Sequence, residues 1–128
     1  QQIYDIRLML EAAAAAEAAR RGCPSLAGAL QGIAAGGEGA LAATSHFYEA
    51  IFRAAGHEIA WEIVSRLNGR ISRLRALTLA SSDRKLSGLA RMERIAQAIA
   101  AGDAEGAAEA VRAHLTEAAG IAKRVLEG

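Results

Sequence analysis

The chain has 128 residues, which matches one domain with a single hydrophobic core. Its 15 basic and 14 acidic side chains are interspersed and give a formal charge of +1, so no basic patch suited to a phosphate backbone is visible. Apolar residues make up 52% of the chain, but a large share of them are Ala. The composition therefore predicts closely packed helices rather than a thick aromatic core, and it argues against DNA binding by this domain.

The chain has a single cysteine, Cys23. A single cysteine excludes an intramolecular disulfide and a zinc site of paired cysteines, so we expect a reducing, cytoplasmic setting. No apolar run approaches the ~18 residues that a membrane span requires, and we expect no membrane contact. The sequence opens without Met and already inside a helical pattern, which indicates a fragment of a longer protein.

Helix breakers divide the first half of the chain into three predicted helices. Gly22-Cys23-Pro24 ends the first helix, because Pro lacks the amide donor and favours the start of a new helix. Gly36-Gly37 ends a short second helix, and Gly56 ends a third after the pattern FYEAIFRAA.

The second half of the chain predicts three more helices. A long fourth helix is expected from about His57 to near Ala80. Ser81-Ser82-Asp83 supplies N-cap candidates for a fifth, and Gly102-Asp103 ends the fifth helix and caps a sixth. No stretch alternates with period two for long enough to be a strand. The fold class predicted is all-α, an antiparallel bundle of about six helices joined by short loops.

Several polar side chains fall on the apolar faces of these helices, because residues three and four apart share a face. Thr44 and Tyr48 lie together on the apolar stripe of the third helix. Met92 lies on the stripe of the fifth helix and His114 on that of the sixth. Arg7 falls on the core side of the first helix, where a buried cation needs a partner and none is obvious beside it.

Distances along the helices place these residues at compatible heights. Met92 and His114 both lie about 15 Å from the turn between their helices, at ~1.5 Å of rise per residue. Counting from the Gly56 turn in the same way brings Ser65 and Asn68 of the fourth helix level with Tyr48 and Thr44. The convergence of several helices predicts an internal polar pocket.

Each of these residues also has an ordinary structural interpretation. Tyr48 and Thr44 could be core residues whose hydroxyls are satisfied by the backbone, and His114 could be a hydrogen-bonded core histidine. Met92 could be simple packing, and Arg7 could extend to the rim of the bundle. The chain contains no glycine-rich phosphate loop, nucleophile elbow or zinc-hydrolase motif, so we predict that it is not an enzyme.

Three segments carry a resemblance to a known family. IYDIRLMLE, then HFYEAIFRAAGH, then ERIAQAIAAGDAEGAAEAVRAHL together resemble the C-terminal effector-binding FCD domain of GntR-type transcription regulators, FadR subfamily. The resemblance covers essentially the whole chain, 1–128, as one domain. It implies a helical bundle that binds a small effector and forms a homodimer, with DNA bound only by an N-terminal winged helix-turn-helix domain that is absent from this chain.

The resemblance also implies a metal site that this sequence has largely lost. Many members hold a divalent metal on one Asp and three His, and those positions correspond to Thr44, Tyr48, Met92 and His114. Only His114 is retained. A hydroxyl, a phenol and a thioether do not replace an Asp and two imidazoles, so we expect no metal and no other cofactor.

The expected pocket therefore has different chemistry from the family's metal site. Tyr48 and His114 would be its hydrogen-bonding groups, Thr44 a minor polar contact and Met92 an apolar wall. Arg7 matches the arginine of the family's opening helix and could meet an effector carboxylate, although a bulkier or more apolar effector also fits a metal-free site. The alternative function is a structural dimerisation bundle whose pocket positions have become ordinary core.

Overall fold

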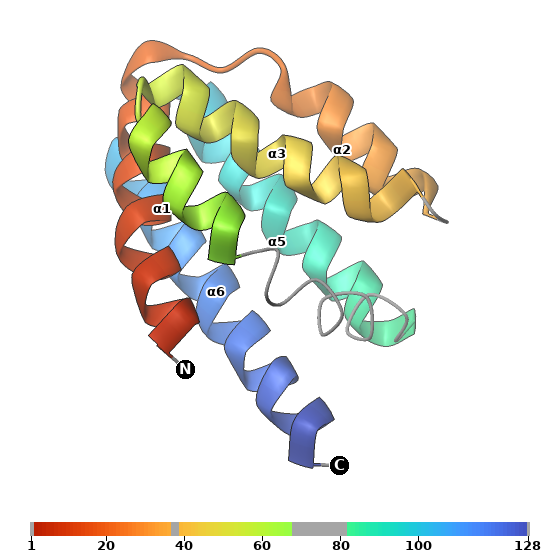
Figure 1. The fold of residues 1–128 in the computed structure, drawn as a ribbon. Coiled ribbons are helices and arrows are strands. Elements are labelled where there is room, and N and C mark those ends of the chain that lie inside the picture. Colours follow the sequence, from red (N-terminus) through yellow and green to blue (C-terminus); the bar gives the residue numbers. More distant parts are fainter. Residues whose placement is uncertain (1, 37–38, 68–81, 128) are drawn as a thin grey trace.

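The computed structural model describes residues 2–36, 39–67 and 82–127. Its named helices are α1 (Gln2–Arg21), α2 (Leu26–Ala35), α3 (Gly39–Ala55), α5 (Ser82–Ala100) and α6 (Ala104–Glu127), shown in Figure 1. A further helix covers residues 58–67. No strand occurs in the described part of the chain. The prediction of an all-α bundle of about six helices is confirmed.

The helix ends lie where the breakers predicted them. Gly56 follows α3 with a φ of 74°, in the left-handed region that only glycine adopts readily, and its amide donates to the Arg53 carbonyl at 3.0 Å. Asp103 caps α6, since its Oδ1 accepts from the Gly106 amide at 2.9 Å. The expected fourth helix is present at 58–67, and its continuation toward Ala80 lies outside the described residues.

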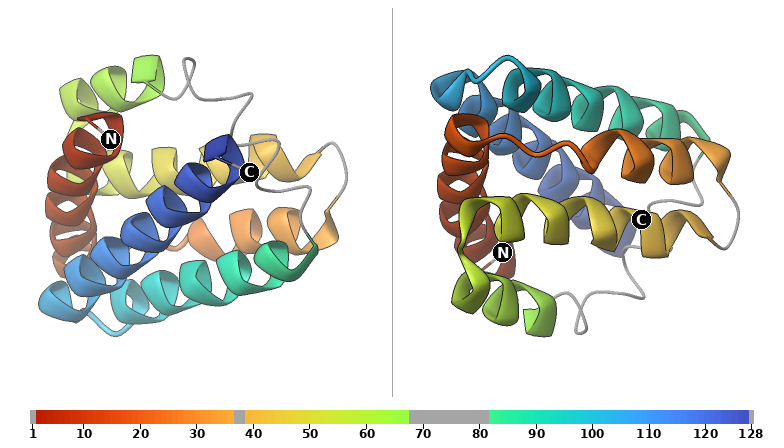
Figure 2. Two further views of the ribbon diagram at one scale, coloured as in Figure 1. Left: turned by 90° about the horizontal axis from the view of Figure 1, so that it is seen from below. Right: turned by 90° about the horizontal axis from the view of Figure 1, so that it is seen from above.

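The helices enclose a shared interior. α1 packs against α6, α3 and α5, while α2 packs against α3 and α5. In both views of Figure 2, α1 runs crosswise along one end of α2, α3 and α5. α5 and α6 run in opposite directions from the turn at Gly102, as short connections require. All five of these helices therefore contribute side chains to the buried core.

The core combines a small-residue face with a modest number of large side chains. The inner face of α1 is made of buried alanines: Ala12, Ala14, Ala15, Ala18 and Ala19. The largest fully buried side chains are Phe47, Phe52, Ile95, Ile99, Leu115 and Val64. Helices with small contact residues approach closely, and a Cβ on Gly32 of α2 would lie 2.9 Å from the Cβ of Ala43 on α3. This packing agrees with the Ala-rich composition.

Among the side chains that the structure describes, four large apolar ones are exposed on the outer surface. Ile6 and Met9 lie on α1, where Met9 is 65% exposed, and Ile59 and Ile63 lie on the 58–67 helix, where Ile59 is 75% exposed. That helix is held to α3 by Trp61, whose ring centroid lies 5.8 Å from that of Phe52. Among the described helices, none has both the length and the apolar character needed to cross a membrane.

Candidate functional site

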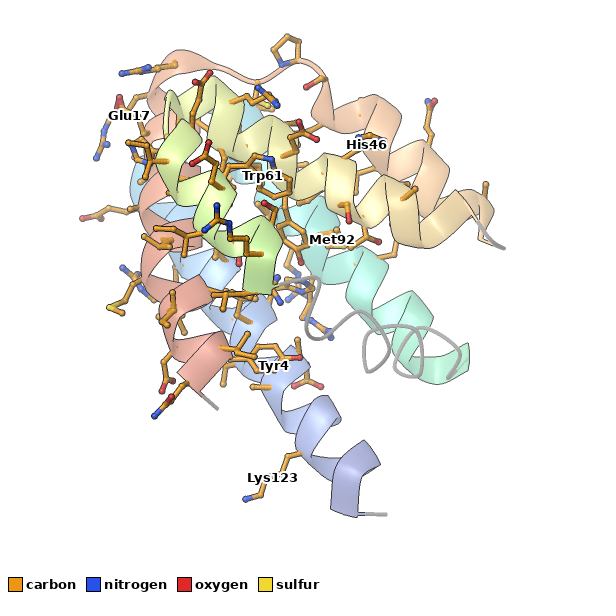
Figure 3. The ribbon with its side chains drawn as sticks, viewed as in Figure 1. Tyr4, Glu17, His46, Trp61, Met92 and Lys123 are labelled. Carbon is orange, nitrogen blue, oxygen red and sulfur yellow. The ribbon has the colours of Figure 1, made fainter. Side chains whose placement is uncertain are left out.

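The polar residues predicted to face inward are buried. Arg7, Thr44, Tyr48, Met92 and His114 are each between 3% and 7% exposed, and they come from α1, α3, α5 and α6. Figure 3 places Met92 in the interior of the bundle, whereas His46, two residues before Tyr48, lies on the outside of α3. The helical periodicity therefore identified the inward positions correctly.

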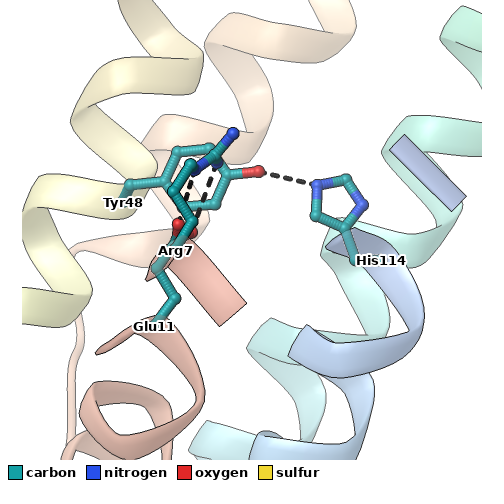
Figure 4. Close-up of polar contacts among 4 residues, drawn as sticks. All are labelled: Arg7, Glu11, Tyr48 and His114. Carbon is teal, nitrogen blue, oxygen red and sulfur yellow. Dashed lines mark hydrogen bonds and ion pairs between the residues drawn. The ribbon is translucent and has the colours of Figure 1, made fainter. Parts of the chain in front are cut away.

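Tyr48 and His114 are joined directly. The Tyr48 hydroxyl lies 2.6 Å from Nε2 of His114, and this contact connects α3 to α6 (Figure 4). The two rings are nearly parallel, at 29°, with centroids 6.2 Å apart, and Phe47 packs edge-on against the Tyr48 ring at 5.7 Å. Hydrogen bonding in a site of low dielectric makes this pair a rigid polar centre.

Arg91 approaches the same histidine from α5. Its Nε donates to Nδ1 of His114 at 3.3 Å, so both ring nitrogens of His114 are hydrogen-bonded. Burial lowers the pKa of Arg91, while Glu117 opposes that shift, yet a guanidinium remains protonated throughout the accessible pH range. Sequence reasoning missed Arg91. It borders the apolar stripe four residues before the buried Ile95, but long side chains at such borders commonly extend to solvent.

Arg7 lies over the ring of Tyr48. Its guanidinium carbon is 5.2 Å from the centroid of the Tyr48 ring and 5.7 Å from that of Tyr4, within the range of cation–π contacts. Figure 4 shows the guanidinium over the phenol ring, beside the hydroxyl that contacts His114. The buried centre thus carries a fixed positive charge.

The charge of Arg7 has a partner that the sequence analysis overlooked. Arg7 Nε donates to Oε2 of Glu11 at 2.7 Å, and Nη2 donates to Oε1 at 3.4 Å, with both side chains 3% exposed. The expectation that no partner lies beside Arg7 is wrong, because residues four apart meet on one helix face. The alternative in which Arg7 extends to the rim is also wrong.

The pKa of Arg7 reflects this pairing. Burial by itself would lower the pKa, but the Glu11 carboxylate and Tyr48 raise it above its ordinary value. The guanidinium is therefore a permanent cation at the centre of the bundle. Such a buried pair is stable only because the charges are matched and hydrogen-bonded.

The fourth helix supplied two candidate residues, Ser65 and Asn68, and the structure describes only Ser65. Ser65 is exposed, and its Oγ donates to the Glu62 carbonyl at 3.1 Å within the same helix. It does not join the buried cluster in this chain. Its neighbour Val64, one position and about 100° earlier, is the residue that faces inward. Asn68 lies outside the described residues.

The donor set at the centre does not fit a divalent metal. Thr44, Tyr48 and Met92 offer a hydroxyl, a phenol and a thioether, and both nitrogens of His114 are engaged by hydrogen bonds. Within the described residues, no group of three or more His, Cys, Asp or Glu is arranged to hold a metal ion.

A cleft of about 580 Å³ lies away from this centre, between the second half of α1 and the start of α6. Its lining residues are Ala16, Arg20, Asp103, Ala104, Glu105, Gly106, Ala108, Glu109 and Arg112. Arg112 pairs with Glu109 at 3.2 Å, and Arg20 pairs with Glu17 at 3.0 Å, both on the surface. Because charges exposed to water interact weakly, the buried centre is the stronger candidate for recognition.

The fold and the buried centre define a helical bundle with a polar core, and comparison with known families makes the class specific. A family model described as the FCD domain matches residues 2–117. The chain belongs to the FCD domain family, the C-terminal effector-binding domains of GntR-type regulators. A comparison with curated proteins found no match.

Proposed function

We propose that this chain is the ligand-sensing, dimerising domain of a GntR-type transcription regulator of the FadR subfamily, and that it binds a small organic carboxylate without a metal. One observation carries the proposal. In a family of effector-binding domains, the centre of this bundle holds a buried guanidinium, Arg7, against a hydrogen-bonded Tyr48–His114 pair. In this proposal, the arginine supplies the positive charge that a metal would otherwise supply.

The chemistry of the centre suits an anion. A guanidinium pairs with a carboxylate through two parallel hydrogen bonds, and such charge-assisted bonds are roughly twice as strong as neutral ones. Glu11 already contacts Arg7 in this way, through two oxygens at 2.7 Å and 3.4 Å. The effector carboxylate would share or displace Glu11, with Tyr48 and His114 as further hydrogen-bonding groups. Met92 and Thr44 would line the site.

The same exchange supplies a route to regulation. A ligand shifts an equilibrium only by its difference in affinity for two states. Replacing the Glu11 carboxylate with a ligand carboxylate would change the forces on α1, which packs against α3, α5 and α6. A dimer of such bundles would transmit that change to DNA-binding heads outside this chain.

Exposed apolar side chains on the surface support the proposed homodimer. Ile6, Met9, Ile59 and Ile63 are exposed apolar side chains on α1 and the 58–67 helix. The two helices are neighbours in each view of Figures 1 and 2. Covering such residues with a second copy would remove apolar area from water, at about 25 cal/mol per Å². Ile59→Glu should therefore weaken self-association in analytical ultracentrifugation, whereas Glu58→Gln should not.

The direct test is thermal stabilisation of the purified domain by divalent metals and by small carboxylates, including fatty acyl compounds, with and without chelator. We expect an organic anion to raise Tm in the presence of chelator, and Arg7→Met to abolish that rise. Arg20→Met is the matched control, because Arg20 is exposed. Stabilisation that the chelator removes would contradict the metal-free site.

A structural dimerisation bundle is the second candidate function. It is favoured by the mutual satisfaction of the buried groups, since Tyr48 contacts His114 and Arg7 contacts Glu11 without any ligand. This candidate predicts a stable dimer whose Tm no small molecule raises. The same thermal screen, combined with the oligomeric state, therefore separates the two functions.

A further inference from the structure

Arg91 fixes where the proton of His114 lies. A guanidinium carries donors only, so Nδ1 of His114 must accept the bond from Arg91 Nε with a lone pair. The single proton of the neutral imidazole then resides on Nε2. That nitrogen lies 2.6 Å from the Tyr48 hydroxyl oxygen, so the histidine is the donor and the phenol oxygen the acceptor in this contact.

The direction of this hydrogen bond determines the role of the Tyr48 hydroxyl. A phenol beside a neutral histidine can donate to the ring nitrogen or accept from it, and the tautomer decides which. With Nε2 protonated, the Tyr48 oxygen accepts from His114, so the hydroxyl proton, which lies in the plane of the ring, is directed away from His114. Both ring nitrogens of His114 are then engaged, Nε2 by its proton and Nδ1 by the bond from Arg91, so neither offers a lone pair to a metal cation.

We propose that Arg91 is a positioning residue that holds His114 as the Nε2–H tautomer, which leaves neither ring nitrogen with a lone pair for a metal cation, so that the site selects oxyanions over metal cations. The assignment of Arg91 stands on the free protein. Only its consequence for ligand choice rests on the proposed carboxylate function. Arg91 acts through His114 rather than by touching the ligand.

The test is the tautomer of His114, read by long-range ¹H–¹⁵N NMR of the ¹⁵N-labelled domain. The chain has three histidines, and His114→Gln assigns the signals of this one. We expect the wild-type spectrum to show Nδ1 as the unprotonated nitrogen and Nε2 as the protonated one. Arg91→Met should shift the population toward the Nδ1–H form, and Arg91→Lys, which restores a donor, should recover much of the wild-type pattern.

Arg94→Met is the matched control, since Arg94 is an exposed arginine one turn along α5. It should leave the tautomer unchanged, and circular dichroism checks that each variant is folded. The proposal is overturned if the wild-type histidine carries its proton on Nδ1, or if the folded Arg91→Met protein keeps the wild-type pattern.

Titration of the same samples with sodium acetate separates this inference from the proposed function. Acetate that shifts the His114 signals in the wild type, and shifts them less in Arg91→Met, supports both. If acetate shifts no signal while Arg91→Met still changes the tautomer, the carboxylate function fails and the role of Arg91 in setting the tautomer is upheld. Equal acetate shifts in both proteins would overturn its role in ligand choice.

Discussion

The Tyr48 hydroxyl and Nε2 of His114 lie 2.6 Å apart although 66 positions separate them in the sequence. This contact ties α3 to α6 through the centre of the bundle. The contribution of this hydrogen bond to stability can be measured.

Replacing Tyr48 with Phe should destabilise the fold. The change removes the acceptor of a buried contact and leaves His114 Nε2 unsatisfied, which costs about 1–3 kcal/mol of unfolding free energy. Tyr4→Phe is the control, because Tyr4 is only partly buried and its ring also faces Arg7. Denaturant unfolding measures both. Equal losses in the two variants would show that the Tyr48 hydroxyl makes no special contribution.

Removing only one partner of the Arg7–Glu11 pair should lower the free energy of unfolding more than removing both partners. Arg7→Met leaves the Glu11 carboxylate buried without its partner, and such a loss typically costs about 3–5 kcal/mol. The double variant Arg7→Met/Glu11→Leu removes both charges and should regain much of that stability. A double-mutant cycle of unfolding free energies measures the coupling, and simple additivity would contradict a tightly coupled pair.

Acid should weaken a surface cluster on α1. Hydrogen bonds from Arg20 and Arg21 hold the pKa of Glu17 below its ordinary value of 4.5. A carboxylate with a lowered folded-state pKa stabilises the protein above its unfolded pKa, and that contribution is lost as the pH falls through the folded pKa. The Tm of the wild type should therefore fall below pH 4.5 more than that of Glu17→Gln. Glu58→Gln, an equal charge change at an exposed position, should follow the wild type.

Restoring the family's ligands should restore a metal site. The triple variant Thr44→Asp/Tyr48→His/Met92→His introduces a carboxylate and two imidazoles at buried positions of α3 and α5. Zn²⁺ should stabilise this variant by about 2.7 kcal/mol when the metal is in roughly 100-fold excess over Kd. A chelator should reverse the effect. A chelator-reversible rise in the wild-type Tm would contradict a donor set unsuited to metals.

The helical segments and their inward faces were predictable because both depend on local chemistry. Gly22, Gly56 and Gly102 adopt positive φ values that end a helix, and Asp103 supplies a cap through its own side chain. The burial of Tyr48 followed from a period of 3.6 residues. These features require only the residue and its near neighbours in sequence.

The partners inside the bundle were harder to predict. Glu11 was within reach of the sequence, since its spacing of four residues from Arg7 is the ordinary distance for a helical ion pair. Arg91 was not, because a long side chain at the edge of an apolar stripe can turn inward or outward. Ser65 is exposed rather than directed to the centre, because the direction of its side chain depends on the rotation of its helix against α3.

The sequence by itself determined an Ala-rich helical domain, the ends of its helices and the residues on its inner faces, because propensity, capping and periodicity act over a few residues. The resemblance to the FCD family further implies that one imidazole and no carboxylate remain at the four metal-ligand positions. Only the tertiary structure decided that His114 is held between Tyr48 and Arg91 and that Arg7 lies over the Tyr48 ring. Those contacts depend on how four helices cross and rotate, and packing across the whole core fixes that geometry.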